Sequence, residues 1–143
     1  MADNVTPEER ARMMSAVRAS DTKPELFVRR SLYASGFRFR LHRSDLPGKP
    51  DIVLPAYRVA VFVHGCFWHG HHCKRGKLPE TRREFWERKI RGNVERDRRA
   101  HAALTAAGWS VVTIWTCELK ERTEQLIAAL RHLRVQRATE LAR

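Results

Sequence analysis

The sequence predicts an α/β or α+β fold in which helices flank a mixed central sheet. Two short apolar segments on either side of a turn, residues 51–54 and 58–63, indicate a hairpin of two strands. A long helical stretch from Thr81 to Ala107 follows, and Gly108 separates it from another strand, Trp109 to Trp115. A hairpin, a crossover helix and a further strand are typical of a mixed sheet covered by helices. The length of 143 residues predicts a single domain.

Two helices are predicted ahead of the hairpin, because each begins with a capping signature. Thr6-Pro7-Glu8-Glu9 opens the first helix, which is expected to reach about Ala19. Its arginine-rich surface favours packing on a partner over burial in the core. Thr22-Lys23-Pro24-Glu25 opens the second helix, and Gly36 ends it.

Hydrophobic periodicity predicts the remaining elements. Residues Phe37 to His42 alternate between apolar and polar side chains, which indicates a half-buried strand, and residues 44–50 form a loop. A final amphipathic helix runs from Leu119 to about Arg134. One side of the long helix carries Ile90, Val94, His101 and Leu104.

The composition restricts the class of protein. The formal net charge is +12 and the sequence pI is about 10.8, which suits nucleic acid, an anionic membrane surface or an unspecialised basic surface. A hydrophobic fraction of 43% excludes disorder throughout. The longest apolar run, Val59 to Val63, is too short to span a bilayer, and residues 1–12 lack an apolar signal segment. We therefore expect a cytoplasmic protein that does not insert into membranes.

A dense group of cysteines and histidines predicts a zinc site. Cys66 and Cys73 flank three histidines, and Cys117 completes the set if its strand returns beside this loop. The spacing leaves the choice between His71 and His72 open. Three thiolates make zinc a poor Lewis acid, so a structural role is favoured over a catalytic one. The alternative is a set of buried thiols beside a solvated histidine loop.

A second group of residues does not fit the zinc site and suits hydrolysis. Asp51 opens one hairpin strand and His64 ends the other, with His69 close by, so a carboxylate and imidazoles meet at one sheet edge. Mg²⁺ binds through carboxylates and substrate phosphates, and a histidine can take a proton from water. Asp51 is alternatively a turn residue that bonds the local backbone. Glu25 can direct its carboxylate at the metal from its helix, but the sequence favours the alternative that it is a helix cap.

Aromatic and basic side chains predict a DNA-contacting surface. Phe67 and Trp68 lie within the metal loop, and Trp86, Lys89 and Asn93 share one stripe of the long helix. Such rings can wedge between stacked bases. The alternative is that the rings fill the core while the lysine and the asparagine are only solvated.

These motifs together resemble the very short patch repair (Vsr) endonucleases, over about residues 5 to 135. The segments that carry the resemblance are Thr22–Glu25, Pro50–Val53, the run Val63–His69 continuing to His71 and Cys73, the set Trp86, Lys89, Asn93 and Asp97, and Trp115–Glu118.

The resemblance implies a restriction-endonuclease-like fold, with a DNA-contacting helix in residues 1–20 and a catalytic core in residues 21–135. It implies a Mg²⁺-dependent enzyme that nicks one strand on the 5′ side of the thymine in a T:G mismatch. Such mismatches arise when 5-methylcytosine deaminates, so a cytosine methyltransferase and mismatch-repair proteins are the implied companions. A monomer near the nucleoid is expected.

The resemblance also implies a role for each matching residue. Asp51 would bind Mg²⁺ together with the backbone carbonyl of Val63, and His69 would be the general base. Glu25 and His64 would support the metal waters and the scissile phosphate. Zinc would take Cys66, His71, Cys73 and Cys117. The DNA contacts would come from a wedge of Phe67, Trp68 and Trp86, from Met14 in the other groove, and from Lys89 and Asn93 as mismatch readers.

Three departures from the pattern accompany this resemblance. Val63 stands where a family member can carry threonine, and Gly70 interrupts a histidine run, which predicts a looser loop. The superfamily's acidic-x-Lys pair is replaced by Val63-His64. The rival interpretations are a non-catalytic, zinc-stabilised DNA-binding module and a zinc hydrolase for a small molecule.

Overall fold

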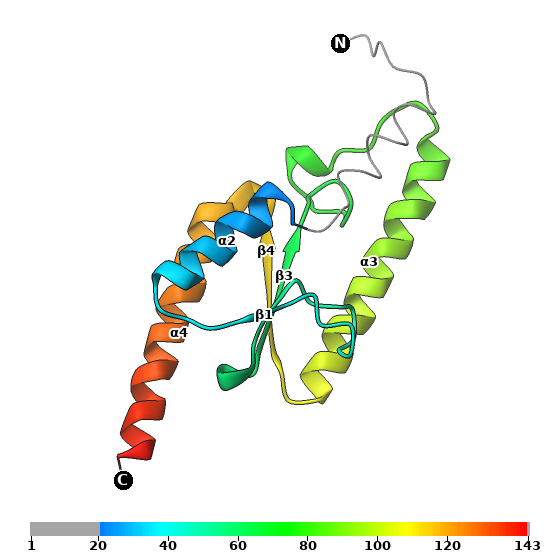
Figure 1. Ribbon diagram of the computed structural model, residues 1–143. Helices are drawn as coiled ribbons and strands as arrows, with labels where there is room; N and C mark the ends of the chain where they lie inside the picture. Colours follow the sequence, from blue (N-terminus) through cyan, green and yellow to red (C-terminus); the bar gives the residue numbers. More distant parts are fainter. Residues whose placement is uncertain (1–20, 143) are drawn as a thin grey trace.

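The computed structural model describes residues 21–142 (Figure 1). The predicted helix at residues 6–19, including Met14, lies outside this range. The described elements, in chain order, are α2 (Lys23–Ala34), β1 (Arg40–Leu41), β2 (Ile52–Leu54), η1 (Pro55–Tyr57), β3 (Val59–His64), η2 (Lys74–Gly76), α3 (Arg83–Ala106), β4 (Ser110–Trp115), η3 (Thr116–Glu118) and α4 (Leu119–Leu141). No helix within residues 21–142 combines the length and apolar character needed to cross a bilayer.

The strands form one mixed sheet in the order β1-β2-β3-β4. β2 pairs antiparallel with β3, as the hairpin pattern predicts, and also pairs antiparallel with β1. β4 pairs parallel with β3, in a register that places Val59 opposite Ser110 and His64 opposite Trp115. A parallel pair needs a crossover connection, and α3 lies within it. The predicted mixed sheet with flanking helices is therefore confirmed.

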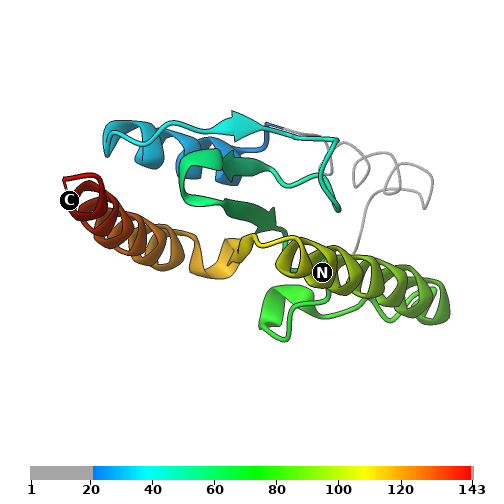
Figure 2. The ribbon, with the colours of Figure 1, turned by 90° about the horizontal axis from the view of Figure 1, so that it is seen from below.

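Helices cover both faces of the sheet (Figure 1). α2 and α4 lie on one face, where Leu32 and Leu130 are fully buried against the strands. α3 covers the other face, where Leu104 packs with Phe62 and Trp109. In Figure 2, α3 and α4 extend in opposite directions from the position of β4. The two apolar layers fix the sheet and leave the carboxyl ends of β3 and β4 open to a loop, residues 65–73.

Three elements differ from the sequence-based prediction. The strand expected from Phe37 to His42 is only Arg40–Leu41, because Phe37 is buried in the core and its N–H bonds to the Leu32 carbonyl at the end of α2. α4 continues beyond Arg134 to Leu141. On α3, Ile90 and Leu104 are buried, whereas Val94 and His101 are exposed.

Gly48 brings the loop before β2 against the sheet and α3. Its φ is +72°, and a Cβ there would lie 2.5 Å from the Ala100 Cβ. We expect Gly48→Ala to lower the free energy of unfolding by about 2 kcal/mol or more, because the backbone conformation and the contact both disfavour a side chain. Urea denaturation of the purified chain measures this change.

Gly92 provides the matched control within α3. A Cβ at this position meets no atom of the described residues within 4 Å. Gly92→Ala should therefore stabilise the chain by roughly 0.5–1 kcal/mol, the ordinary helix preference of alanine over glycine. Equal effects of the two substitutions would contradict the close approach at Gly48.

Candidate active site

A cleft of about 690 Å³ opens where β2 begins and β3 ends. Its walls come from α2, the loop before β2, the end of β3, the loop that follows it, and α3. The structure brings the four residues predicted for hydrolysis into this one cleft: Glu25, Asp51, His64 and His69. They come from four separate chain segments, so the fold assembles the site.

Asp51 is held at the start of β2 by a bond across the hairpin. Its Oδ2 accepts a hydrogen bond from the Val63 N–H at 2.7 Å, so the carboxylate bonds a distant strand and not a local turn. The pKa of Asp51 is raised to about 6, mainly by burial and to a smaller extent by the nearby negative charge of Glu25. The Val63 bond, His42 and His69 oppose this rise. A buried carboxylate whose negative charge has so little nearby positive charge favours the binding of a cation.

Glu25 caps α2 and also lines the cleft. Its backbone N–H donates to Thr22 Oγ1 at 3.4 Å, and its Oε2 accepts from the Asp21 N–H at 3.1 Å, which caps α2. The same side chain is only 6% exposed and lines the cleft with Asp51. Capping therefore fixes the Glu25 carboxylate close enough to act electrostatically on Asp51.

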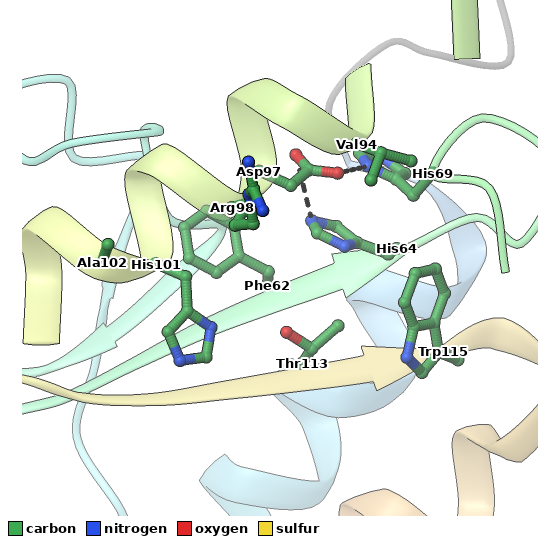
Figure 3. A pocket seen from close by; sticks show the side chains of 10 residues that line it. All are labelled: Phe62, His64, His69, Val94, Asp97, Arg98, His101, Ala102, Thr113 and Trp115. Carbon is green, nitrogen blue, oxygen red and sulfur yellow. Dashed lines mark hydrogen bonds and ion pairs between the residues drawn. The ribbon is translucent and has the colours of Figure 1, made fainter. Parts of the chain in front are cut away.

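His64 and His69 form a stacked imidazole pair beside Asp97 of α3. The ring centroids are 3.7 Å apart and the planes are parallel. The Asp97 carboxylate lies 2.6 Å from His69 Nδ1 and 4.0 Å from His64 Nε2, and Figure 3 shows both contacts. Burial, with His69 close by, lowers the pKa of His64 to about 3, so His64 is neutral near pH 7.

Asp97 determines which nitrogen of His69 is free. An ionised carboxylate only accepts hydrogen bonds, so the proton of a neutral His69 lies on Nδ1 and leaves the Nε2 lone pair available. Asp97 belongs to one of the motifs that resemble the family, but its sequence spacing indicates no role for it. The signal that identifies it is spatial, since 28 residues separate it from His69.

Gly70 brings the loop after His69 close to α3. Its φ is +64°, and a Cβ there would lie 2.8 Å from Val94 Cγ2 and 2.9 Å from Ile90 Cγ2. The described contacts show a close approach to α3 at this glycine, and the looser loop expected from it stays a prediction. Glycine permits a contact that places His69 within reach of Asp97.

The predicted cysteine and histidine group gathers next to the cleft. The ligand atoms of Cys66, His71, Cys73 and Cys117 all lie within 4.8 Å of one another. Cys117 follows the end of β4 and its Sγ lies 3.5 Å from His71 Nδ1. The structure thus places His71, and not His72, in this group. Three thiols and one imidazole are the donor set of a closed, structural zinc site.

Phe67, Trp68 and Trp86 form an aromatic cluster between the loop and α3. Their ring centroids are 5.3–5.9 Å apart, with edge-to-face contacts. Trp86 is only 8% exposed, which matches the core alternative for this residue in the free chain. Asn93 is also buried, and its amide nitrogen donates to the Trp68 carbonyl at 2.9 Å. Lys89 is half-buried on the same helix.

A buried carboxylate in the same cleft as an imidazole whose tautomer is fixed suits hydrolysis, because a base there can act on water. Comparison with known proteins identifies the family of hydrolases to which the chain belongs. The family model described as DNA mismatch endonuclease Vsr matches residues 2–75. The chain belongs to this family and is therefore an endonuclease, a hydrolase of phosphodiester bonds.

Individual relatives extend the match over most of the chain. The type II nicking enzyme V.XorIIP of Xanthomonas oryzae pv. oryzae is 53% identical, over 85% of this chain and 89% of the relative. The type II nicking enzyme V.NmeAIP of Neisseria meningitidis serogroup A is 43% identical, over 85% and 87%. The DNA mismatch endonuclease Vsr of Escherichia coli is 44% identical, over 91% and 83%.

Replacing Asp51 by asparagine should stabilise the chain when no divalent cation is added. The pKa of Asp51 in the folded chain, about 6, lies above its ordinary value of 3.8. The folded chain therefore binds this proton more tightly, and stability is lost as the pH rises through about 6. We expect Asp51→Asn to add about 2 kcal/mol to the free energy of unfolding at pH 7.5, and less than half of that at pH 4.

Asp45→Asn is the control for this experiment. Asp45 is exposed, and its bond with Arg43 lowers its pKa, so asparagine should give no gain in stability at either pH. Urea denaturation of both variants and the parent chain makes the comparison. If Asp51→Asn shows no gain that depends on pH, the carboxylate is not destabilised by burial.

Proposed function

We propose that this endonuclease nicks one strand of duplex DNA on the 5′ side of the thymine in T:G mismatches and acts in very short patch repair. The observation that carries the proposal is one cleft that holds Asp51, Glu25 and the His69–Asp97 pair beside an aromatic loop. A deaminated 5-methylcytosine creates the mismatch, so a cytosine methyltransferase is the companion activity, with mismatch-repair proteins acting afterwards.

Mg²⁺ is the proposed catalytic cation. Asp51 and the backbone carbonyl of Val63 would hold it, which suits a hard ion that prefers oxygen ligands. Val63 has no hydroxyl group, so only its backbone could contribute. When bound, such a cation offsets the negative charge that develops on the phosphate oxygens. The buried and poorly compensated carboxylate of Asp51 supports this assignment.

His69 is proposed as the general base. With its Nδ1 proton directed at Asp97, its Nε2 can accept a proton from the attacking water. His64 stacks against His69 as a neutral ring, so it limits the movement of the base without adding positive charge. Glu25 is proposed to accept hydrogen bonds from water within the cleft.

Zinc is proposed to hold the loop that carries the base and the aromatic rings. Cys66, His71, Cys73 and Cys117 would join the segments that follow the ends of β3 and β4. The loop between them has few buried apolar side chains, so a metal would supply much of its stability. A small-molecule zinc hydrolase would need an open ligand position, which this donor set does not favour.

The aromatic cluster and the basic surface are proposed to recognise the mismatch. Phe67, Trp68 and Trp86 would enter the base stack, which costs less at a mismatch than at a regular pair. Lys89 and Asn93 would read the bases. Asn93 donates one amide hydrogen to the Trp68 carbonyl, and its amide nitrogen carries a second hydrogen that could contact a base.

The proposed setting follows the family. The chain would act as a monomer in the cytoplasm, at the nucleoid, with a restriction-endonuclease-like fold. Residues 1–20 would contact the DNA, with Met14 in the groove opposite the aromatic wedge.

Nicking of a T:G duplex with Mg²⁺ tests the activity. His69→Ala is expected to lower the rate by about 100-fold or more, and Asp51→Ala should lower it to background. His132→Ala, an exposed histidine of α4, is the control and should leave the rate unchanged. If the parent chain and Asp51→Ala bind the duplex but are equally inert, the chain is a non-catalytic, zinc-stabilised DNA-binding module.

A panel of mismatches and flanking bases then defines specificity.

Removal of one thiol tests the structural zinc. Cys117→Ala should lower the melting temperature by several degrees and reduce the bound zinc measured by elemental analysis. Adding a zinc chelator should destabilise the parent chain but not Cys117→Ala. An unchanged melting curve would exclude a structural metal. Activity without Mg²⁺ that disappears with zinc, while the fold persists, would identify a zinc hydrolase instead.

Trp68→Ala tests the aromatic wedge. We expect this variant to lose preference for a T:G over a T:A duplex by more than it loses overall affinity, because the wedge acts where unstacking is easiest. Tyr33→Ala, which removes an exposed ring on α2, is the control and should leave the preference unchanged. Equal losses of affinity for the T:G and T:A duplexes would contradict the proposed role of Trp68 as a wedge.

A further inference from the structure

A second group of metal-binding side-chain types lies beside the cleft, at the start of α2. Asp21, Glu25 and His42 each place one ligand atom within 4.8 Å of the others, which is the spacing of a metal site. This group adjoins the proposed Mg²⁺ site, since His42 Nδ1 lies 4.0 Å from Asp51 Oδ1. Nucleases with two metal ions place them about 3.5–4 Å apart. These three side chains could therefore bind either a metal ion or a positively charged side chain.

An arginine nitrogen is already at the centre of this group. Arg29 Nη2 lies 2.5 Å from Asp21 Oδ1, 3.2 Å from Glu25 Oε2 and 3.0 Å from His42 Nε2. One atom therefore contacts one ligand atom from each member, as a metal ion would. The Arg29 side chain is 13% exposed and comes from α2, one turn after Glu25. A guanidinium is a planar cation with several hydrogen-bond donors and no acceptor.

The position of Arg29 also sets the state of His42. Arginine has only donors, so when an Arg29 N–H points at His42 Nε2, at 3.0 Å, that nitrogen accepts. The same nitrogen lies farther from Asp21 Oδ1, at 3.6 Å, and from Glu25 Oε2, at 3.5 Å. The proton of a neutral His42 is then on Nδ1, the atom that faces Asp51 Oδ1. A metal on Nε2 would impose the same tautomer. Arg29 thus reproduces both effects of a second cation: it compensates Glu25 and it orients His42 toward Asp51.

We propose that Arg29 is a positioning residue that takes the place of a second divalent cation, so that the cleft admits a single divalent ion, at Asp51. This inference rests on the proposed function, because it presumes that Asp51 holds the catalytic ion. It predicts that removal of the guanidinium converts Asp21, Glu25 and His42 into a new site for a divalent ion with oxygen and imidazole ligands.

Mn²⁺ binding to the zinc-loaded full chain, counted by electron paramagnetic resonance without DNA, tests the inference. The experiment uses the Asp51→Asn background, so that the proposed catalytic ion does not contribute. In this background, Arg29→Ala is expected to gain one additional Mn²⁺ per chain, and His42→Ala added to it should remove the gain. Arg29→Lys keeps a cation in place and should gain none. Arg30→Ala, its exposed neighbour on α2, is the matched control and should also gain none.

A chemical rescue separates this site from non-specific binding. Ethylguanidinium restores the missing group and should displace the additional Mn²⁺ from Asp51→Asn/Arg29→Ala. Far-UV circular dichroism checks the fold, and Arg29→Gln, which keeps most of the side-chain volume, gives the same test if the alanine variant does not fold. No additional Mn²⁺ in either variant, or an additional Mn²⁺ already bound when Arg29 is present, would overturn the inference. Failure of the parent chain to bind Mn²⁺ at Asp51 would instead contradict the proposed function. The comparison of the Arg29 variants would still be valid, because it is made in the Asp51→Asn background.

Discussion

The parallel pairing of β3 with β4 is the constraint on which the site depends. It sets His64 opposite Trp115, so the chain leaves both strands at the same edge of the sheet. Cys66 and Cys117 follow these two strand ends, and for this reason the cysteine and histidine group can close. A shift of one residue in the register would reverse the faces of every side chain on β4. The ladder therefore fixes the loop that carries His69 and the aromatic rings.

Some polar side chains of the cleft have close hydrogen-bonding or charged partners and one carboxylate has few. This difference agrees with the proposed binding of a cation. Arg29 compensates Glu25, and Asp97 holds His69 in one tautomer, so both side chains are fixed before any substrate arrives. Asp51 is the exception, because burial raises its pKa and only a backbone N–H bonds it closely. Burial of the ionised Asp51 carboxylate lowers the stability of the chain, and a bound cation would offset this loss. Such a loss of stability at a functional site is common in enzymes.

Local patterns were enough to predict the sheet, the crossover helix and the cysteine group, since periodicity, Gly108 and ligand spacing lie within short segments. Contacts between distant segments were not predictable in this way. Asp97 reaches His69, and Arg29 reaches His42, only because packed helices bring them together, and neither pair has a spacing signature. The effect of Gly70 likewise depends on how closely α3 approaches.

The central claim is that one divalent cation binds at Asp51 next to the paired imidazoles. Nuclear magnetic resonance of the histidine rings during a Mn²⁺ titration measures this directly, because a paramagnetic ion broadens nearby resonances. The account predicts early loss of the His64 and His69 ring signals, a sharp signal from His132 on α4, and no such difference in Asp51→Asn. Uniform broadening of all three rings, or selective broadening that persists without the Asp51 carboxylate, would contradict it.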